Sequence, residues 1–400
     1  MSGAAPAPFG RGSSAPLAGR TVLQIVAPPP SGGDERAALA VAAALIEAGA
    51  RALVACESRE FASELQAVGG LHVPFPSSAK NPLTMSLNAR RLARILADER
   101  VDLVHARSRG AAWLALAAAR KPKRAVVTAL PADGGAPPRT SFDRAVGEGD
   151  LVTAPSQFAA ERAARHFPAA LDRLRIVRPG LELARLSPEA VSRERVAAAR
   201  ESFGAAPHER IVLAPARLIA SRGQRVLIEA AALLKARGVA DLRFVMAGDA
   251  PKGAFVRELD ALAAERGVKA SVARVEAPGD RPAAFLAAAA VVFPATEPEG
   301  VSRAALEAAA MGALTIVSDV GAAAEILAAP PHADPGERAG WLAPPGDAAA
   351  LADAIEAAIA LGASAREAIR RRARAGLAER HARERMTADT LKVYAEALER

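Results

Sequence analysis

The amino-acid sequence predicts an α/β fold made of two doubly wound domains in tandem, each a parallel sheet with helices on both faces. From Thr21 onward, short runs rich in Val, Ile and Leu alternate with longer Ala- and Leu-rich stretches, the pattern of buried parallel strands joined by helices. The segment from Leu186 to Ala206, which contains Pro188, interrupts this alternation. We therefore expect a domain boundary there, and a cleft where the carboxyl ends of both sets of strands meet.

The two halves of the chain carry similar sets of candidate strands and helices. In the first half the strands are expected at 22–26, 52–56, 103–105, 125–128, 151–154 and 175–178, and the helices at 37–48, 86–99, 112–120 and 159–164. In the second half the strands are expected at 211–214, 243–247, 271–275, 291–293, 314–318 and 340–342, and the helices at 225–235, 255–266, 304–311 and 348–361.

The ends of the chain differ from these two halves. Residues 1–19 are rich in Ala, Pro, Gly and Ser and lack the continuous apolar core of a secretory signal, so we expect a disordered leader there. Residues 365–400 are charged and strongly helical in pattern. The predicted organisation is a leader at 1–19, a first domain at 20–187, a second domain at 205–384, and a C-terminal helix at 385–400 that packs back on the first domain.

Composition narrows the class of protein. A length of 400 residues favours two or three domains. The single cysteine, Cys56, excludes a disulfide framework and a cysteine-built metal site, and we expect it to be a small buried core residue. The longest apolar run, from Ala283 to Ala295, is too short to span a bilayer. We therefore expect a cytoplasmic protein.

The net charge of +8 arises entirely in the first half of the chain. Residues 1–185 contain 24 Lys and Arg against 16 Asp and Glu, whereas residues 186–400 contain 28 of each class. Such a basic surface could meet anionic lipid headgroups, nucleic acid or a phosphorylated substrate, or remain a solvated face. Only one aromatic residue, Trp113, lies among the basic clusters, which argues against stacking on single-stranded nucleic acid. The clusters are Arg90, Arg91 and Arg94, and Arg107, Arg109, Arg120, Lys121, Lys123 and Arg124.

The stretch of residues 291–321 carries the most information about function. It reads VVFPATEPEGVSRAALEAAAMGALTIVSDVG, which predicts a buried strand, an acidic loop, a helix and a second buried strand. Gly300, Val301 and Ser302 lie where the helix is expected to begin. Free backbone N–H groups at a helix start form a site for a diphosphate, so we expect these residues to bind one.

Two glutamates flank the start of this helix. Glu307 lies about one and a half turns into it, within reach of the ribose hydroxyls of a bound nucleotide, whereas Glu299 lies in the preceding loop, nearer the sugar end. The alternative is that such carboxylates only complement the helix dipole. The whole stretch resembles the E-x7-E motif of glycosyltransferase family 4, EPExFGRxxxEAxAMGxPVIxSDxG. The matching residues are Glu297, Pro298, Glu299, Arg303, Glu307, Ala308, Ala310, Met311, Gly312, Ser318, Asp319 and Gly321.

Other segments of the second half resemble the same family. Residues 215–224 read PARLIASRGQ and are similar to PGRLTxxKGQ, whose Arg and Lys clamp the donor diphosphate. Arg217 matches the arginine, and Arg222 replaces the lysine with another cation. Two cations beside a departing nucleotide stabilise charge that grows in the transition state; ordinary surface charge is the alternative. Gly248 lies in an AGD sequence like that of the family, and residues 340–347 (GWLAPPGD) resemble its GWLVPPGD turn.

The first half shares shorter motifs with the family. Residues 31–36 (SGGDER) resemble its SGGxER loop, whose glycines, here Gly32 and Gly33, allow the backbone to approach a phosphate or acceptor closely; a plain tight turn is the alternative. Residues 80–83 and 105–109 are similar to the KNPL and HARSR sequences of proteobacterial members, and we expect His105 to be structural. The resemblance extends over roughly residues 21 to 396.

One departure from the family concerns the reacting centre. Members usually carry T-x-H-G after the fourth strand, with a histidine that contacts the sugar, whereas residues 128–131 read TALP and place Leu130 at that position. A leucine side chain can neither donate nor accept a hydrogen bond. Residues 179–182 (PGLE) also replace an NGVD-like turn.

The resemblance implies a GT-B fold, in which two Rossmann-like domains face each other across a cleft, and a hexosyltransferase-type activity of the cell-envelope kind. A sugar would pass from a nucleotide-diphosphate donor to a glycan or lipid-linked acceptor, with retention of configuration and with no metal or cofactor. Glu307 would bind the ribose and Glu299 the transferred sugar, and Glu299, Arg217 and Arg222 form the expected catalytic set. The basic first half would make peripheral contact with an anionic membrane at its cytoplasmic face, and no nucleic acid is expected to bind.

Two other functions stay open at this point. A catalytically weakened homologue that binds a nucleotide sugar or a protein partner is the first, and Leu130 motivates it. The second is a sugar epimerase or a phosphorylase on the same two-domain fold. No lysine cassette of the pyridoxal-binding kind is recognisable in the sequence, which weighs against the phosphorylase.

Overall fold

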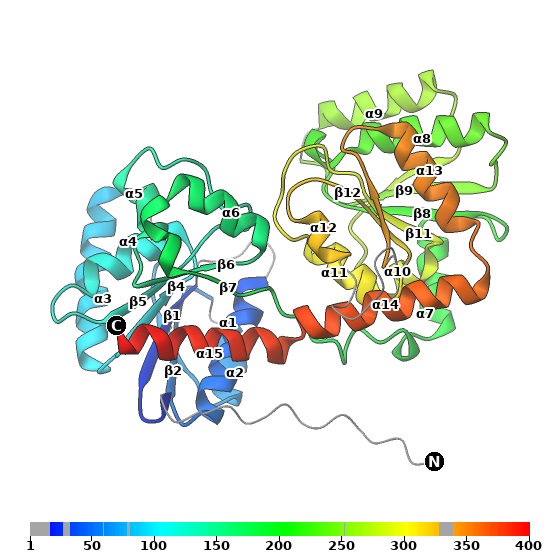
Figure 1. The fold of residues 1–400 in the computed structure, drawn as a ribbon. Helices are drawn as coiled ribbons and strands as arrows, with labels where there is room; N and C mark the ends of the chain where they lie inside the picture. The colour runs from blue at the N-terminus through cyan, green and yellow to red at the C-terminus, as the bar shows by residue number, and fades with distance from the viewer. Residues whose placement is uncertain (1–16, 27–32, 59, 78–80, 252, 328–338) are drawn as a thin grey trace, which may run out of the picture.

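The computed structural model describes residues 17–400 except 27–32, 59, 78–80, 252 and 328–338. The described part contains two parallel sheets flanked by helices, in two domains that lie side by side (Figure 1). The tandem α/β arrangement predicted from the alternation of strand and helix patterns is therefore confirmed.

Both sheets have the doubly wound strand order. The first sheet has the order β3-β2-β1-β4-β5-β6-β7 and the second β10-β9-β8-β11-β12-β13. In each sheet the order therefore reverses beside the first strand of the domain, which makes that point the expected place for a ligand. The strands are β1 (Thr21–Ile25), β2 (Arg51–Cys56), β3 (Leu71–Pro74), β4 (Leu103–Ala106), β5 (Ala125–Ala129), β6 (Leu151–Ala154), β7 (Leu174–Ile176), β8 (Arg210–Pro215), β9 (Leu242–Ala247), β10 (Val272–Val275), β11 (Ala290–Phe293), β12 (Thr315–Ser318) and β13 (Trp341–Ala343).

The helices follow the strands in nearly regular alternation, and several of them begin earlier than the sequence pattern predicted. Asn81 explains one early start, because its side chain accepts hydrogen bonds from the amides of Leu83 and Thr84 and caps α3 ahead of the apolar pattern. The helices are α1 (Gly33–Glu47), α2 (Glu60–Ala67), α3 (Pro82–Asp98), α4 (Arg109–Ala118), α5 (Ser141–Arg144), α6 (Gln157–His166), α7 (Arg193–Ser202), α8 (Gln224–Ala236), α9 (Gly253–Glu265), α10 (Arg281–Ala287), α11 (Arg303–Ala310), α12 (Ala323–Ile326), α13 (Ala348–Ile359), α14 (Ala363–His381) and α15 (Arg383–Glu399).

Every expected strand is present, with ends that differ by at most two residues, but some elements were missed. β3 is an edge strand with exposed or half-buried side chains, so its sequence, LHVP, shows no buried apolar run. The apolar run from Ala283 to Ala295 is not one element: it contains most of α10 followed by β11. The interruption after Leu186 contains α7, which packs against α10 of the second domain.

The chain crosses between the domains twice, and the two crossings pair with each other. The amide of Leu181 donates to the carbonyl of His381 at 2.7 Å, and the amide of Arg383 donates to the carbonyl of Leu181 at 2.9 Å. After the second crossing α15 runs along the first domain beside α1 (Figure 1). His105, which the sequence analysis took as structural, is buried in β4 and its Nδ1 forms a 2.7 Å hydrogen bond with the hydroxyl of Tyr394 on α15.

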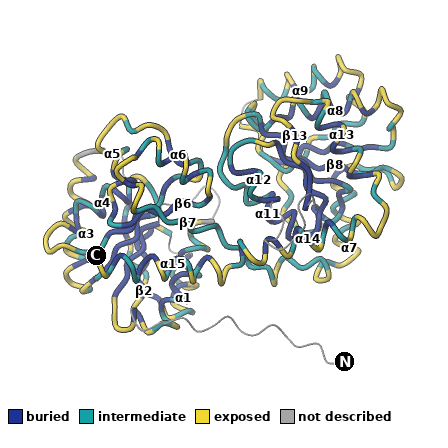
Figure 2. The backbone as a smooth tube through the Cα atoms, viewed as in Figure 1, coloured by how far each residue is buried: buried dark blue, intermediate teal, exposed yellow. Residues whose placement is uncertain are grey.

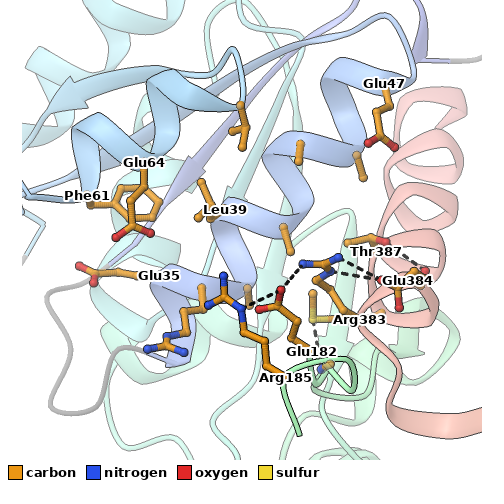
Figure 3. A pocket seen from close by; sticks show the side chains of 18 of the residues that line it. Glu35, Leu39, Glu47, Phe61, Glu64, Glu182, Arg185, Arg383, Glu384 and Thr387 are labelled. Atoms are coloured by element: carbon orange, nitrogen blue, oxygen red, sulfur yellow. Dashed lines mark hydrogen bonds and ion pairs between the residues drawn. The ribbon is translucent and has the colours of Figure 1, made fainter. Parts of the chain in front are cut away.

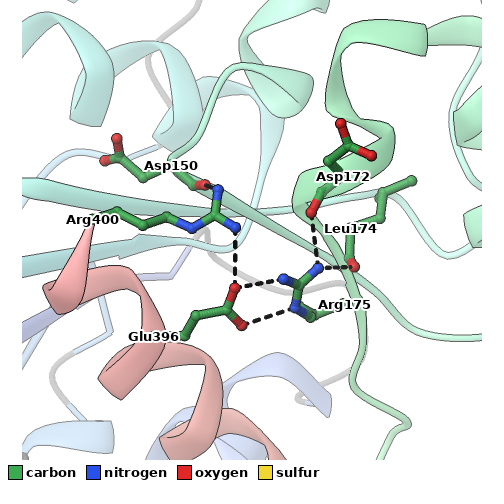
Figure 4. Close-up of polar contacts among 6 residues, drawn as sticks. All are labelled: Asp150, Asp172, Leu174, Arg175, Glu396 and Arg400. Atoms are coloured by element: carbon green, nitrogen blue, oxygen red, sulfur yellow. Dashed lines mark hydrogen bonds and ion pairs between the residues drawn. The ribbon is translucent and has the colours of Figure 1, made fainter.

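The end of α15 is held by charged groups (Figure 4). Glu396 accepts one hydrogen bond from Arg175 of β7 at 2.8 Å and another from Arg400 at 3.1 Å. Arg175 also donates to the backbone carbonyls of Asp172 and Leu174 at 3.1 and 2.7 Å. The C-terminal helix is thus tied to the far edge of the first sheet.

The buried residues concentrate in the strands and along the sides of the helices that face the sheets (Figure 2). Cys56 is 1% exposed, as expected for a core residue, and burial raises the pKa of its thiol to about 11. No single helix in the described part of the chain is both long and apolar enough to cross a bilayer; α13 and α14 taken together pass such a test on length and composition, with a bend of 111° between them.

Candidate functional site

The candidate site lies where the order of the second sheet reverses. β8 and β11 are neighbours there, and the loops that follow their carboxyl ends contain the basic motif and the acidic motif found in the sequence. Because parallel strands end at the same edge of a sheet, the two loops meet. Between them lies a cavity of about 200 Å³. Its lining residues are Pro215, Ala216, Arg217, Arg222, Phe293, Ala295, Glu299, Ser302 and Ala304.

Glycines permit the loops of this site to pack closely. Gly223 has a left-handed backbone (φ +72°), and a Cβ at this position would collide with the carbonyl oxygen of Pro294. A Cβ at Gly248, after β9, would collide with the carbonyl of Ala216 in the loop after β8. Gly248 therefore supports the cavity wall through its backbone and does not itself line the cavity.

Arg217 and Arg222 both line the cavity and place two cations beside one carboxylate. Arg222 forms an ion pair with Glu299. Burial, and then the positive charge of Arg217, lower the pKa of Arg222, so the two guanidinium groups repel each other across the cavity. The buried amide of Gln224 donates a 2.9 Å hydrogen bond to the carbonyl of Arg217 and orients that segment. An anionic ligand placed between the two cations would relieve their repulsion.

The helix that carries Glu307 begins at the predicted place. Ser302 is the N-cap of α11, and its hydroxyl accepts a hydrogen bond from the amide of Ala305 at 3.4 Å. Gly300 and Val301 precede it, and a Cβ at Gly300 would collide with Ala132 of the first domain. The start of the helix therefore faces the opposite domain at very short range.

Glu307 is not among the residues that line the cavity. It is 5% exposed, and its carboxylate accepts hydrogen bonds from Arg303, four residues earlier, at 2.9 Å and from Arg281 at 3.2 Å. Arg303 belongs to the motif, but the sequence analysis missed Arg281. Arg281 lies in the first turn of α10 and meets Glu307 only because α10 packs beside α11, a contact for which the sequence carries no local signal.

The wall contributed by the first domain is small and apolar. Leu130, at the position of the family's histidine, is 7% exposed and packs in the core of the first domain. Pro131 and Ala132 follow it and bring the backbone to Gly300. Of the predicted glycines, Gly32 lies outside the described residues, and Gly33 is the first residue of α1.

A larger cavity, of about 710 Å³, lies between α1, α2 and the start of α15 (Figure 3). Glu182 on its wall contacts Arg185 at 3.2 Å and Arg383 at 3.3 Å. Burial, and then the charge of Glu64, raise the pKa of Glu35 on the wall. Among the described residues that line this cavity, none belongs to the predicted site set. We therefore centre the candidate site on the smaller cavity, where opposite charges converge.

Comparisons with known proteins agree with this geometry. Residues 196–376 match the model of the glycosyl transferases group 1, and residues 31–185 match the model of glycosyltransferase family 4. No protein of curated function matches the chain.

Several solved structures are similar over nearly the whole chain. A glycosyltransferase from Rickettsia africae ESF-5 is 25% identical with a TM-score of 0.82, and the match covers 95% of this chain and 99% of that one. Anabaena Alr3699/HepE in complex with UDP and glucose is 20% identical with a TM-score of 0.73, covering 94% and 99%. Sucrose-phosphate synthase from Thermosynechococcus elongatus is 17% identical with a TM-score of 0.69, covering 94% and 98%. The chain therefore belongs to the group 1 glycosyltransferases, family 4, and has their GT-B fold of two facing Rossmann-like domains.

Proposed function

We propose that this glycosyltransferase moves a hexosyl group from a nucleoside-diphosphate sugar, bound by the second domain, to an acceptor on the first-domain side of the cleft. The observation that carries the proposal is the convergence of Arg217, Arg222 and Glu299 on one cavity at the point where the strand order reverses. Two guanidinium groups match the charge of a diphosphate, and a carboxylate beside them matches the hydroxyls of a sugar.

The ion pair between Arg222 and Glu299 suggests how the donor is accommodated. Diphosphate oxygens would draw Arg222 away from Glu299, and the freed carboxylate would accept hydrogen bonds from the sugar. In the transfer step the bond between the anomeric carbon and the diphosphate oxygen breaks, and the acceptor oxygen bonds to the same carbon. The acceptor proton passes to the departing diphosphate. The two arginines stabilise the charge that grows on that group, so the proposed reaction requires no metal.

We also propose that the anomeric configuration is retained, as the resemblance to the family implies. Retention requires the acceptor oxygen to bond on the face that the diphosphate leaves. We assign no carboxylate nucleophile.

A thermal-shift screen against UDP, GDP, ADP and TDP and their sugars tests donor binding, because a ligand that binds only the folded state raises the melting temperature. UDP-glucose is the first probe, since Anabaena Alr3699/HepE was crystallised with it. We expect one nucleotide series to stabilise the protein and the variant Arg217→Ala with Arg222→Ala to lose that shift. A screen with no shift for any nucleotide would remove the donor site.

A catalytically weakened homologue is the second candidate, and the burial of Leu130 in the first-domain core favours it. The first-domain wall lacks the histidine that contacts the sugar in relatives, so donor binding need not lead to transfer. A single-turnover assay with the stabilising donor separates the two candidates. Transfer or donor hydrolysis supports the enzyme, and binding without either supports a nucleotide-sugar-binding subunit.

For the acceptor, we propose a lipid-linked or envelope glycan at the cytoplasmic face of an anionic membrane. The helix α3 supports this proposal: Leu83 and Leu87 are 73% and 56% exposed. Arg90, Arg91 and Arg94 are exposed on the same helix at spacings that place them along the same side. Exposed apolar side chains followed by arginines suit a helix that lies on anionic headgroups.

Vesicle flotation tests this contact. The protein is expected to bind vesicles containing phosphatidylglycerol at low salt and to dissociate at high salt, and the triple variant Arg90→Ala, Arg91→Ala and Arg94→Ala is expected to bind weakly. A matched control removes three exposed arginines that lie outside the first domain. Binding that salt does not change, or that both variants lose equally, would argue against α3. The control positions are Arg193, Arg257 and Arg371.

A further inference from the structure

One carboxylate of the second domain caps a helix of the first domain. Glu325, on the short helix α12, accepts a hydrogen bond from the backbone amide of Gln157 at 3.0 Å and another from that of Phe158 at 2.9 Å. The two bonds use different carboxylate oxygens. The donors are the first two amides of α6, which have no partner within their own helix.

The cap is shared between the two domains. Ser156, the N-cap of α6, accepts a hydrogen bond from the amide of Ala159 at 3.0 Å, so the first domain satisfies the third donor of the helix itself. The first and second donors are left to Glu325, which is 168 residues away in the sequence. A carboxylate at a helix N-terminus is stabilised by both hydrogen bonds and the helix dipole.

The segment that bears Glu325 is attached to the candidate site. The amide of Ala322 donates to the carbonyl of Glu299 at 2.9 Å. Gly321, with φ +67°, packs so closely that a Cβ there would collide with the backbone of Glu299. The segment that bears Glu325 is therefore packed directly against the backbone of Glu299, whose carboxylate is expected to meet the sugar.

The contact also lies away from the covalent crossings between the domains. Figure 1 shows α6 and α12 facing each other, with the two crossings near the start of α15. The paired crossings at Leu181 and Ala382 form an isolated parallel bridge. If the domains rotate about that bridge, the Glu325 contact breaks, and so does the approach of Ala132 to Gly300.

We propose that Glu325 is a positioning residue that holds the two domains together across the cleft and keeps the first-domain loop after β5 over the donor-binding loop. This inference goes beyond the proposed function, because it concerns how the two walls are held in register and not which donor is used. Loss of the contact leaves the second-domain cavity complete, so donor affinity stays the same while the wall opposite it moves away.

The amide of Gln157 can be removed without disturbing the helix. Gln157 is the first residue of α6, a position where proline is favoured and its missing N–H costs nothing within the helix. Ser156 before it is extended, with φ −160° and ψ 165°, which suits a residue preceding proline. Gln157→Pro therefore deletes one bond to Glu325, and Gln157→Ala is the matched control that keeps the amide.

Two measurements on the unliganded full chain test the contact without any need for turnover. In Glu325→Ala and Gln157→Pro we expect small-angle scattering to give a larger radius of gyration than in the wild type and in Gln157→Ala. In Glu325→Ala, hydrogen exchange at the amides of Gln157 and Phe158 should accelerate by about tenfold or more, as expected for the loss of hydrogen bonds to a charged group. Unchanged scattering in both variants, together with unchanged exchange in Glu325→Ala, would overturn the proposal.

A kinetic comparison separates positioning from a merely structural role. We expect Glu325→Ala to lower kcat about tenfold while UDP affinity stays within about twofold, and Glu325→Asp, which cannot reach α6, to resemble it. Glu325→Gln should lower kcat less when it is added to Gln157→Pro than when it is introduced into the wild type, because the first variant has already removed part of the same contact. Equal losses of affinity and turnover would instead indicate a local defect in α12. If the protein transfers no sugar, small-angle scattering and hydrogen exchange still test whether Glu325 holds the two domains together.

Discussion

The two walls of the candidate cleft are built from different kinds of side chain. The second domain contributes Arg217, Arg222 and Glu299 around one cavity, whereas the first domain brings the backbone of Ala132, in the loop after β5, against Gly300. On one side charged groups are held by glycine-supported loops, and on the other side a backbone segment is placed against Gly300.

This difference indicates a division of labour. The charged groups that we propose bind the diphosphate all follow strands of a single sheet, so they should come together wherever the second domain folds. The first-domain loop approaches the second domain through the backbone of Ala132. Any contribution it makes to transfer therefore depends on how closely the two domains are held together. Donor binding should therefore tolerate changes in the first domain, and transfer should not.

The largest effect is expected on the charged wall. Arg222→Ala should lower kcat by about 100- to 1000-fold, because a half-buried cation expected beside the departing diphosphate is removed, and Glu299 also loses its partner. Single-turnover rates at saturating donor measure this loss. The control is Arg222→Lys, which matches the residue usual in the family and should keep most of the rate. A loss of less than about fivefold would show that Arg217 alone suffices.

The second prediction concerns Glu307, the buried carboxylate on α11. Glu307→Ala should weaken nucleotide binding by about 1–3 kcal/mol, because the ribose loses an acceptor. Isothermal titration with the nucleotide that stabilises the protein measures it. Arg281→Ala, which removes one of the two guanidinium partners of Glu307, should weaken binding less. Were Arg281→Ala the more damaging change, the arginine and not Glu307 would be the ligand-binding group.

The third prediction tests whether the side chain of Leu130 packs in the core of the first domain and not toward the cleft. Leu130→His should destabilise the fold by about 1–2 kcal/mol, because a polar ring would enter a buried apolar site, and it should not raise the rate of transfer. Chemical denaturation and the single-turnover assay measure the two quantities. Leu130→Met is the control of similar volume. A faster enzyme would mean that the position faces the reacting centre.

The smallest effect is expected where the two walls touch. Gly300→Ala should lower kcat about fivefold with nucleotide affinity unchanged, because its Cβ would collide with Ala132 and push the domains apart. Gly279→Ala, at a glycine whose added Cβ meets no neighbour, is the matched control. If Gly300→Ala weakened nucleotide binding as much as turnover, the loop itself would have changed shape.

Local patterns predicted most of the fold. Buried strands of a parallel sheet read as short apolar runs, so the strands of both sheets were found, apart from the edge strand β3. Caps such as Asn81 and Ser302 are also local signals. The sequence likewise placed the basic and acidic motifs after two strands, and the reversal of strand order then brings them together at one cavity.

What the sequence by itself determined is most of the strands, the longer helices between them and the chemistry of the charged wall, because these depend on residues near one another in the chain. Only the tertiary structure decided the partners of Glu307 and Glu325. Arg281 meets Glu307 through the packing of two helices, and Glu325 meets α6 across 168 residues. Such contacts depend on how two domains are placed relative to each other, and that placement is set by the paired crossings and the docking of α15, neither of which leaves a periodic pattern in the sequence.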